Sequence, residues 1–503
     1  MKMTRGGKKT SIWNIFFSYL NVINLIASGF LLVPVYISIL GSAQYGSWLA
    51  LSVAVGWLGF LDLGLAKILV IKISQEYQNG IISKKFSGIL SIGLMISFIL
   101  SAMVLLVGLM AQKGILSYLN IIGANNMASI NQAYLILVIA TSLLVLSHGI
   151  NAINLGMQSS LGVGIIFNAS MSIGIISTFI LLKNNFGIES MAFGALIQSI
   201  LILLGNIFYL GWRRSYERIK INFDPKELRL FIRDMSFNFI SNLFNTVSSG
   251  IDVLVLSKFF GSDLVSIYTL NKRPYEMVKT FIDRPSMALI PSLSSLFSIN
   301  DLIKLDKYIK YIFLYTIWGI GLFSSGLILL GGDFIKLWVG SELYAGSYIG
   351  ILLLLGMITS CLLNVFLNIH ISYGEIKNTS LVNIIQSSLS IAMILLLGIK
   401  YGIVGVAYSL IISNLLLFVL ISLLDKIRII NKNSFFIFIR ECVVSAISVS
   451  IIILIFKNTI LFGWINLFIC AFKISLLYII LLFFLSKEFR FSLNKMRLRL
   501  LKC

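Results

Sequence analysis

Long apolar segments alternate with short polar ones along almost the whole chain. A helix that spans a bilayer needs about 20 consecutive apolar residues, and the sequence contains about 14 such segments. We place them at residues 12–38, 45–71, 87–111, 132–155, 162–182, 188–211, 232–258, 263–297, 310–331, 344–373, 379–399, 402–424, 436–456 and 464–486. Lipid cannot satisfy backbone N–H and C=O groups, so each segment should form an α-helix. The pattern therefore predicts an all-α polytopic membrane protein, whose first apolar segment is a span rather than a cleaved signal.

The composition supports this prediction. Hydrophobic residues make up 58% of the chain, charged residues make up 12%, and the mean hydropathy is +0.97. A soluble protein of this size could not cover so much apolar surface. The net charge of +21 would indicate nucleic acid in a soluble protein. Here most basic residues lie between apolar segments, so membrane topology explains them better and we expect no nucleic-acid partner.

The distribution of Lys and Arg also predicts the orientation. With the N-terminus placed inside, the predicted cytoplasmic segments carry 29 of the 40 basic residues. The predicted outer loops carry six, which are Lys113, Lys183, Lys258, Lys336, Lys400 and Lys457. Cytoplasmic loops are enriched in basic residues, so we expect both termini in the cytoplasm. Thirteen spans would make the second half of the chain violate this rule.

An internal repeat divides the predicted helices. Residues 168–201 match residues 383–416 at an offset of 215, and this match aligns Gly187 with Gly402. Gly41 matches Gly261 at an offset of 220, and Asn21, Asn24 and Ser28 match Asn242, Asn245 and Ser249 at an offset of 221. These matches predict two parallel six-helix repeats, a plan that transporters use. We therefore expect an N-lobe at 1–211, a basic linker at 212–231, a C-lobe at 232–424, two extra helices at 436–486 and a basic tail at 487–503.

Polar side chains recur at helical spacing in the first helix of each predicted repeat. In the second repeat they are Asn238, Asn242, Asn245, Ser249 and Asp252, and in the first they include Asn14, Ser18, Asn21, Asn24 and Ser28. Spacings of three and four residues would keep such groups on one face. They either bind neighbouring helices together or line a wet cavity. The stripe occurs in both repeats, which favours cavity lining by Asn21, Asn24, Asn242, Asn245 and Ser249.

The segment 263–297 carries an unusual number of charges, which are Lys272, Arg273, Glu276, Lys279, Asp283 and Arg284. Residue 272 lies roughly 15 Å inside the predicted helix at a rise of 1.5 Å per residue, where a charge costs about 3 kcal/mol. The spacing predicts i,i+4 ion pairs Lys272–Glu276 and Lys279–Asp283. Arg273 and Arg284 would then need another anion, either Asp252 or a substrate phosphate. Prolines at 274, 285 and 291 should bend the helix; the alternative is that the segment is a loop.

Several other polar residues are candidates for ion coupling. Asp62 lies in the oily stretch GWLGFLDLGLAKIL, near the inner boundary, where an ion pair with a neighbouring lysine and a proton site are both open interpretations. His148, Glu276 and Glu375 are weaker candidates, although a histidine between helices is more often simply hydrogen-bonded. Lys473 lies well inside the last span, where it would need a partner carboxylate or an anionic lipid. We find no motif for nucleotide binding, metal hydrolysis or a nucleophilic serine, and expect no catalytic residue, metal or cofactor.

The stretch 32–74 resembles a known family. Its order of Pro34, Leu40-Gly41, Tyr45-Gly46, Trp48 and Asp62-Leu63-Gly64-Leu65 is similar to the start of Wzx-type polysaccharide-biosynthesis flippases, members of the MOP exporter superfamily. The second half is similar in carrying Asp252, Gly261, Tyr268 and the pair Lys272-Arg273. The similarity extends over the full length, including the layout of six, six and two helices.

The resemblance implies alternating access between two six-helix lobes in the bacterial inner membrane. The substrate would be an undecaprenyl-pyrophosphate-linked oligosaccharide for O-antigen or capsule, moved with H⁺ or Na⁺ coupling. Membrane lipids, a polysaccharide polymerase and a chain-length regulator are the expected partners. The resemblance would place the pyrophosphate on Lys272, Arg273, Lys279 and Arg284, the sugars on the asparagines, and charge balance or ion coupling on Asp62 and Asp252.

Two rival functions fit the sequence less well. A MATE-type drug exporter would share the fold, but organic cations suit a cavity with two surplus arginines poorly. A membrane polysaccharide polymerase or glycosyltransferase would need catalytic outer loops, and the predicted outer loops are short and nearly chargeless.

Overall fold

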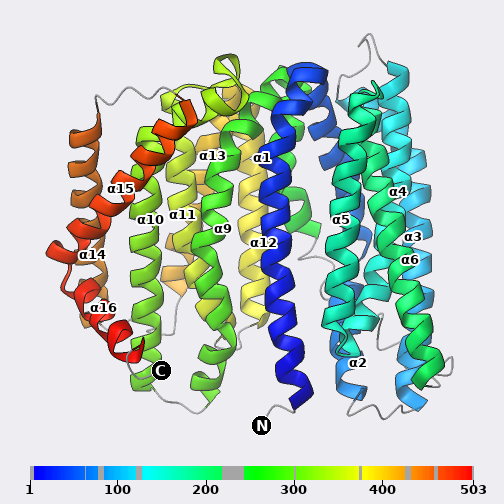
Figure 1. The fold of residues 1–503 in the computed structure, drawn as a ribbon, viewed down its shortest axis with the longest axis horizontal. Coiled ribbons are helices and arrows are strands. Elements are labelled where there is room, and N and C mark those ends of the chain that lie inside the picture. Colours follow the sequence, from blue (N-terminus) through cyan, green and yellow to red (C-terminus); the bar gives the residue numbers. More distant parts are fainter. Residues whose placement is uncertain are drawn as a thin grey trace. The chain divides into compact units, whose positions relative to one another are not determined.

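The computed structural model describes residues 5–62, 64–77, 84–119, 127–217, 231, 243–298, 302–372, 376–424, 432–457 and 463–500. Most of these residues are helical, short turns join some of the helices, and no strand occurs among them (Figure 1). The first elements are α1 (Arg5–Gly56), η1 (Trp57–Asp62), α2 (Leu65–Glu76), α3 (Lys84–Tyr118), α4 (Met127–Gly156), α5 (Ser160–Lys183), α6 (Glu189–Glu217) and α8 (Ile251–Phe260). They are followed by α9 (Ser262–Ser298), α10 (Leu302–Val339), η2 (Ser341–Leu343), α11 (Ser347–Ser372), α12 (Ile376–Met393), η3 (Ile394–Gly398), α13 (Ile399–Leu424), α14 (Lys432–Phe456), α15 (Gly463–Leu485) and α16 (Lys487–Leu500).

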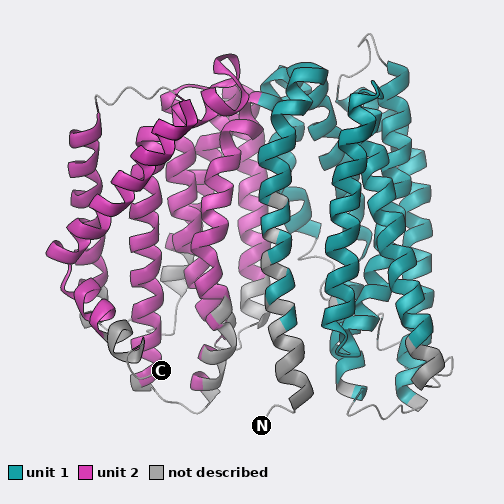
Figure 2. Ribbon diagram, viewed as in Figure 1, with its two compact units in different colours: residues 1–266 teal, residues 267–503 magenta. Residues whose placement is uncertain are grey.

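The predicted fold class is confirmed: this is a multi-pass helical membrane protein. Ten candidate membrane spans occur among the described residues. Two of them, 26–62 and 381–419, run across the end of one predicted span into the next. The predicted total of 14 spans, and the lobe boundaries, stay predictions. The chain separates into two compact units, residues 1–266 and 267–503 (Figure 2).

Small residues let the helices of unit 1 pack closely. Ser101 on α3 and Ser142 on α4 each donate a hydrogen bond to the other's backbone oxygen, both at 2.9 Å. Asn154 on α4 donates from Nδ2 to Asn206 Oδ1 on α6 at 3.1 Å. A Cβ at Gly149 would collide with the Ser97 side chain. Such contacts between small and polar residues hold membrane helices together where the hydrophobic effect supplies no force between them.

Two pairs of glycines have positive φ at positions that match in the predicted repeat. Gly41, which breaks α1, has φ 75° and ψ 168°, and Gly261, between α8 and α9, has φ 91° and ψ 167°. Gly187 and Gly402 have φ 56° and φ 59°. Residues with a side chain rarely adopt positive φ. The sequence matches at offsets of 220 and 215 therefore coincide with glycines of positive φ, and the tandem repeat stays a prediction.

Two predicted helices are interrupted in the structure. The predicted span 45–71 is not one α-helix, because it tightens into η1, and Gly64, in a left-handed conformation at φ 73°, precedes α2. The predicted helix 232–258 is interrupted within the described residues by a turn at Ser249-Gly250, after which α8 begins. By contrast, α9 runs unbroken from Ser262 to Ser298, so the alternative that this charged segment is a loop was wrong.

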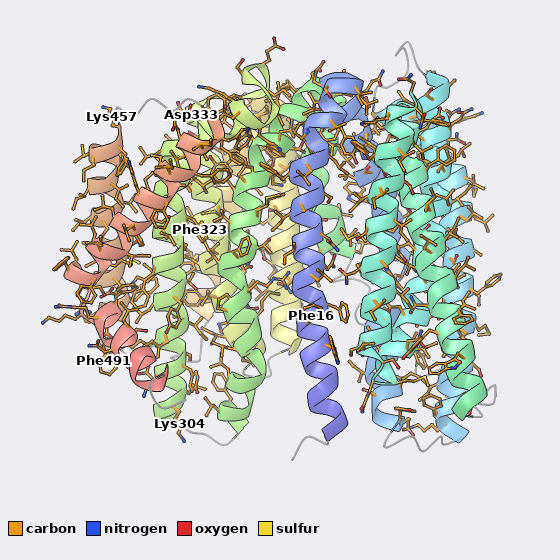
Figure 3. The ribbon with its side chains drawn as sticks, in the orientation of Figure 1. Phe16, Lys304, Phe323, Asp333, Lys457 and Phe491 are labelled. Carbon is orange, nitrogen blue, oxygen red and sulfur yellow. The ribbon has the colours of Figure 1, made fainter. Side chains whose placement is uncertain are left out.

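The helices of unit 2 run between two polar ends. Figure 3 shows Lys304 at the start of α10 and Phe491 on α16 at one end, and Asp333 and Lys457 at the other. This arrangement agrees with the predicted topology, which places Lys304 and the C-terminal tail inside and Lys457 outside. Between the ends, α10, α14 and α15 share an apolar core that includes Leu314, Leu330, Ile452, Ile474, Tyr478 and Leu482.

A buried carboxylate joins α10, α14 and the start of α16. Glu441 on α14 is completely buried and accepts hydrogen bonds from Ser486 Oγ at 2.6 Å, Trp318 Nε1 at 3.2 Å and Arg440 Nη2 at 2.9 Å. Ser486 Oγ in turn accepts from the Phe489 N–H at 3.0 Å, which caps the first turn of α16. Glu441 was not among the predicted functional residues, because it follows the basic stretch 426–440 and lies outside the predicted repeat.

We predict that Glu441→Ala destabilises unit 2 by on the order of 3 kcal/mol, because it leaves two buried donors and a half-buried arginine without their acceptor. Thermal unfolding in detergent, followed by tryptophan fluorescence, should show a lowered Tm. Glu342→Ala is the control, because Glu342 is exposed in η2 and its loss should change the Tm little. Equal melting of the two variants would contradict the assignment of Glu441 as an anchor.

Candidate functional site

The charged residues of α9 form the two ion pairs that their spacing predicted. Lys272 Nζ lies 3.0 Å from Glu276 Oε1, and Lys279 Nζ lies 2.9 Å from Asp283 Oδ2. Both predictions are confirmed. Over residues 272–284 the helix carries four basic and two acidic residues. This stretch of α9 therefore has a surplus of two positive charges.

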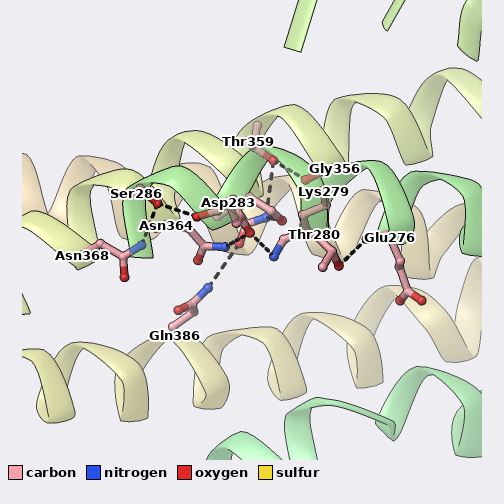
Figure 4. Close-up of polar contacts among 12 residues, drawn as sticks. Glu276, Lys279, Thr280, Asp283, Ser286, Gly356, Thr359, Asn364, Asn368 and Gln386 are labelled. Carbon is pink, nitrogen blue, oxygen red and sulfur yellow. Dashed lines mark hydrogen bonds and ion pairs between the residues drawn. The ribbon is translucent and has the colours of Figure 1, made fainter. Parts of the chain in front are cut away.

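The Asp283 carboxylate is the centre of a polar cluster between α9 and α11 (Figure 4). The residue is 7% exposed, and its Oδ2 accepts hydrogen bonds from Lys279 and from Asn364 Nδ2, the latter at 2.7 Å. One turn further along, Asn368 Nδ2 donates to Ser286 Oγ at 2.9 Å. Within the described part of the chain, Oδ1 of Asp283 accepts no N–H or O–H. The carboxylate thus contacts one cation, one amide and the Cys361 thiol on α11, and its Oδ1 is buried.

Further amides extend the cluster to α12 and α13. Asn414 on α13 donates from Nδ2 to Ser360 Oγ at 2.8 Å and Thr359 Oγ1 at 3.3 Å, both on α11. Gln386 on α12 approaches Asn414 Oδ1 at 3.5 Å. In Figure 4 Lys279 and Asn364 point toward Asp283, and Gln386 points toward the same cluster from another helix. Four helices of unit 2 therefore contribute hydrogen-bonding groups to one polar interior.

The two arginines of α9 are both partly exposed. No carboxylate among the described residues lies within ion-pair distance of Arg284, whereas Arg273 takes part in further contacts. Arg273 and Arg284 lie eleven residues, or roughly 16 Å, apart along the helix. Both guanidinium groups present planar donors that suit phosphate or carboxylate.

Of the predicted polar residues in unit 1, Asn24 contacts a neighbouring helix, whereas others are exposed or have a buried oxygen. Asn24 donates from Nδ2 to Asn168 Oδ1 on α5 at 3.2 Å, and Asn168 donates to the Gly164 carbonyl at 2.9 Å. This contact supports a helix-packing role for Asn24. Asn245 and Ser249 are exposed, and Asn21 has a buried Oδ1 with no donor among the described residues. Asn242 and Glu375 lie outside the residues that the structure describes.

One predicted stripe does not form a single face. Asp252 is 3% exposed in the first turn of α8 and accepts a hydrogen bond from the Val253 N–H at 2.9 Å. The turn at Ser249-Gly250 separates it from Asn245, which is exposed. A carboxylate in the first turn is stabilised by the helix dipole. Asp252 therefore lies at a helix start, and its predicted place on one stripe with Asn245 and Ser249 was wrong.

The coupling candidates lie at separate places. Asp62 ends η1 and His148 is half-buried in α4, whereas Glu276 is mostly exposed on α9. Asp62 and Asp283 correspond in the predicted repeat, at the offset of 221 that relates Asn21 to Asn242. Asp62 follows Gly41 by 21 residues, and Asp283 follows Gly261 by 22. Adding 221 to the position of Asp62 gives Asp283, so the repeat pattern alone could have identified Asp283 as a candidate site residue.

The equivalent turns after Gly41 and Gly261 contact each other, both within unit 1. Ser42 Oγ donates to Asp263 Oδ1 at 2.5 Å, Ser266 Oγ donates to the Ser42 carbonyl at 2.6 Å, and the Ser47 and Ser262 hydroxyls lie 3.0 Å apart. A Cβ at Gly46 would collide with the backbone carbonyl of Ser262. The topology prediction places both turns on the outer side of the membrane. We call this set of residues the outer contact.

Comparisons with known proteins agree with this fold. The family model described as "Polysaccharide biosynthesis protein" matches residues 14–297, and the model "Lipid II flippase MurJ" matches residues 166–475. The chain belongs to the polysaccharide biosynthesis protein family. The resemblance seen in the sequence is thereby confirmed, and the matches place the chain in the MOP superfamily. The family includes transporters and flippases, which fits the expectation of a protein that is not an enzyme.

Individual relatives of this polysaccharide biosynthesis protein agree with the family. A Shigella flexneri protein named "Putative O-antigen transporter" is 24% identical over 411 residues, covering 80% of this chain and 93% of that protein. The fold is similar to that of lipid II flippase MurJ in an inward closed conformation, with a TM-score of 0.70 and 18% identity, covering 95% and 99% of the two chains. A MATE multidrug transporter in an inward-facing conformation has a TM-score of 0.58 and 15% identity, covering 88% and 96%.

Proposed function

We propose that this protein moves undecaprenyl-pyrophosphate-linked oligosaccharide repeat units from the inner to the outer leaflet of the bacterial inner membrane. The family and the curated relative support transport of this class of glycan. The observation that carries the proposal is the surplus of two positive charges on α9 between residues 272 and 284. A charge within the membrane is costly and marks a functional site. A pyrophosphate is the anion in this substrate that would neutralise the surplus.

The spacing of the cations supports a stepwise path for the pyrophosphate. Arg273 and Arg284 are roughly 16 Å apart, which is too far for one pyrophosphate to contact both. By the predicted topology, Arg284 lies nearer the cytoplasm and Arg273 nearer the membrane centre. Each arginine can form two parallel hydrogen bonds to phosphate, and Lys279 between them adds a point charge. The substrate would therefore contact Arg284 first and Arg273 later.

Sugar hydroxyls need amide and hydroxyl partners. The polar interior of unit 2 offers Asn364, Asn368, Gln386 and Asn414. In unit 1, Asn21 and the exposed Asn245 remain candidates for the same role. Such partners tolerate different sugars, because an amide can both donate and accept a hydrogen bond.

Ion coupling can follow from the Lys279–Asp283 pair. A pyrophosphate that draws Lys279 away would leave the buried carboxylate of Asp283 without its cation, and a proton could then balance its charge until the lysine returns. Other ionisable groups near the pair are Glu276 and Lys272 on α9 and the Cys361 thiol on α11. Substrate binding would thus bring a proton to Asp283, and release of the substrate would return Lys279.

This coupling predicts that Asp283→Asn loses its response to a pH gradient. The amide of the variant can still accept a hydrogen bond from Asn364 but cannot take up a proton. In proteoliposomes, gradient-driven transfer of lipid-linked oligosaccharide should fall at least about tenfold, a difference of about 1.4 kcal/mol, while transfer without a gradient persists. Asp333→Asn is the matched control, because it makes the same change in a carboxylate of α10 at the end opposite Lys304. An unchanged response in Asp283→Asn would exclude this carboxylate as the proton carrier.

The proposed function is tested by deleting the gene in its native host and extracting the lipid-linked repeat units. We expect surface polysaccharide to be lost and single undecaprenyl-linked units to accumulate on the inner leaflet. Units that reach the outer leaflet but stay unpolymerised would instead indicate a polymerase. Dye efflux that depends on the gene, with normal surface polysaccharide, would indicate a MATE-type exporter, whose fold this chain shares.

A further inference from the structure

One lysine lies in the middle of a membrane span on the outward face of unit 2. α15 runs from Gly463 to Leu485, and Lys473 is exposed near its centre. The same face carries the exposed apolar side chains Ile465, Phe468, Ile469, Phe472, Leu476, Ile480, Phe483 and Phe484. These residues recur at spacings of three and four and form one stripe along the helix, which we call the α15 stripe. Its only charged member is Lys473.

The depth of Lys473 makes its exposure costly. It is about 15 Å along the helix axis from Gly463 and about 18 Å from Leu485, at a rise of 1.5 Å per residue. A lysine has a four-carbon stem, which covers only a fraction of either distance, so its ammonium group cannot easily reach a headgroup. Facing lipid there would cost about 3 kcal/mol. No carboxylate among the described residues lies within ion-pair distance of Lys473.

Other exposed stripes in the described chain lack this feature. The lipid-facing side of α14 carries Val443, Ile447, Leu454 and Ile455, and that of α3 carries Phe98, Met103, Leu106 and Met110. Within the ten candidate spans, the other lysines and arginines lie toward a helix end or, like Lys400, beside a turn between two predicted spans. The exposed face of α15 therefore differs from the exposed apolar faces of α14 and α3, because it carries Lys473 near its middle.

We propose that the α15 stripe is the docking surface for a transmembrane helix of another protein, which carries an aspartate or glutamate near its own midpoint. Charge complementarity specifies this occupant, because a carboxylate at the same depth would neutralise Lys473 inside the bilayer. The flanking phenylalanines would pack against the partner helix. A second copy of this chain using the same face would bring two lysines together, so the stripe does not suit a symmetric dimer. α15 lies at an edge of unit 2, where a helix can approach it (Figure 1).

The test is photo-crosslinking in native membranes. A photoreactive phenylalanine analogue replaces Phe472, beside Lys473, and in a control strain it replaces Leu454 on α14. We expect a discrete protein adduct from position 472 and none from position 454. The adduct should persist in Lys473→Arg and fall at least tenfold in Lys473→Leu. Thermal unfolding of Lys473→Leu should occur at or above the Tm of the parent, because leucine is more favourable than lysine on a lipid-facing surface.

The adduct supports the proposal only if its sequenced peptide contains a carboxylate within a span of about 20 apolar residues. Exchange of the two charges, with Lys473→Glu here and lysine in place of the partner's carboxylate, should then restore crosslinking. An adduct between two copies of this chain, an adduct with lipid alone, or a protein adduct unaffected by Lys473→Leu would each overturn the proposal.

Discussion

Joining Ser47→Cys to Ser262→Cys by a disulfide is expected to stop transport completely and reversibly. The two hydroxyls lie 3.0 Å apart in the outer contact, so sulfurs at these positions can reach bonding distance with small adjustments. The outer contact joins equivalent turns of the two repeats. In alternating access the outer side must open, and transporters with this fold are known in both inward-facing and outward-facing conformations. A covalent bond here would hold the outer side closed.

The measurement is transfer of lipid-linked oligosaccharide in proteoliposomes before oxidation, after oxidation and after reduction. The native cysteines Cys361, Cys442, Cys470 and Cys503 are first replaced, and free thiols are counted with a maleimide reagent. The pair Ser101→Cys and Ser142→Cys is the control, because those hydroxyls are also 3.0 Å apart but join α3 to α4 within one repeat. Both pairs should oxidise, and only the first should stop transport. Full transport through an oxidised outer contact would show that this contact does not open.

Replacing Arg273 by alanine is expected to abolish surface polysaccharide while the protein stays folded in the membrane. The side chain is partly exposed on α9 and would supply paired hydrogen bonds to the pyrophosphate. Loss of hydrogen bonds to a charged group costs about 1.5–3 kcal/mol, or a fall in transport of roughly 10- to 150-fold. Quantified surface polymer, with membrane abundance of the protein measured in parallel, checks this outcome.

Two further variants separate charge from geometry. Arg273→Lys keeps the charge but loses the planar fork, so it should restore transport only in part. Arg490→Ala removes an exposed arginine from α16 and should leave surface polysaccharide unchanged. Normal polysaccharide in Arg273→Ala would remove the pyrophosphate role from this residue, although Arg284 would remain open to the same experiment.

Local geometry explains what the sequence could predict. The pairs Lys272–Glu276 and Lys279–Asp283 need only one continuous helix, and the spacing of four residues implied both. The breaks at Gly41 and Gly261 fall in the short gaps between predicted spans, at residues 39–44 and 259–262. The family was recognised from the order of several short motifs in residues 32–74. Those motifs lie where helices turn or meet.

Contacts between distant segments explain what it could not predict. Asn364 is 81 residues from Asp283, and Ser486 is 45 residues from Glu441. Apolar periodicity locates helices but does not say which faces meet. The breaks after Gly56 and at Ser249-Gly250 were also missed, because a run of apolar residues scores as a span whether or not its backbone stays α-helical.

The shared geometry of Gly41 and Gly261 bears on how the molecule arose. An ancestral gene for one half, copied in tandem, would give two turns with one backbone shape and two carboxylates, Asp62 and Asp283, at one register. The copies have since specialised: Asp283 gained Lys279 one turn away, whereas Leu58 occupies the matching place before Asp62. Duplication would thus have supplied two similar frames, and later substitutions at several positions, including Arg273 opposite Ser52 and Arg284 opposite Leu63, made one half more positively charged than the other.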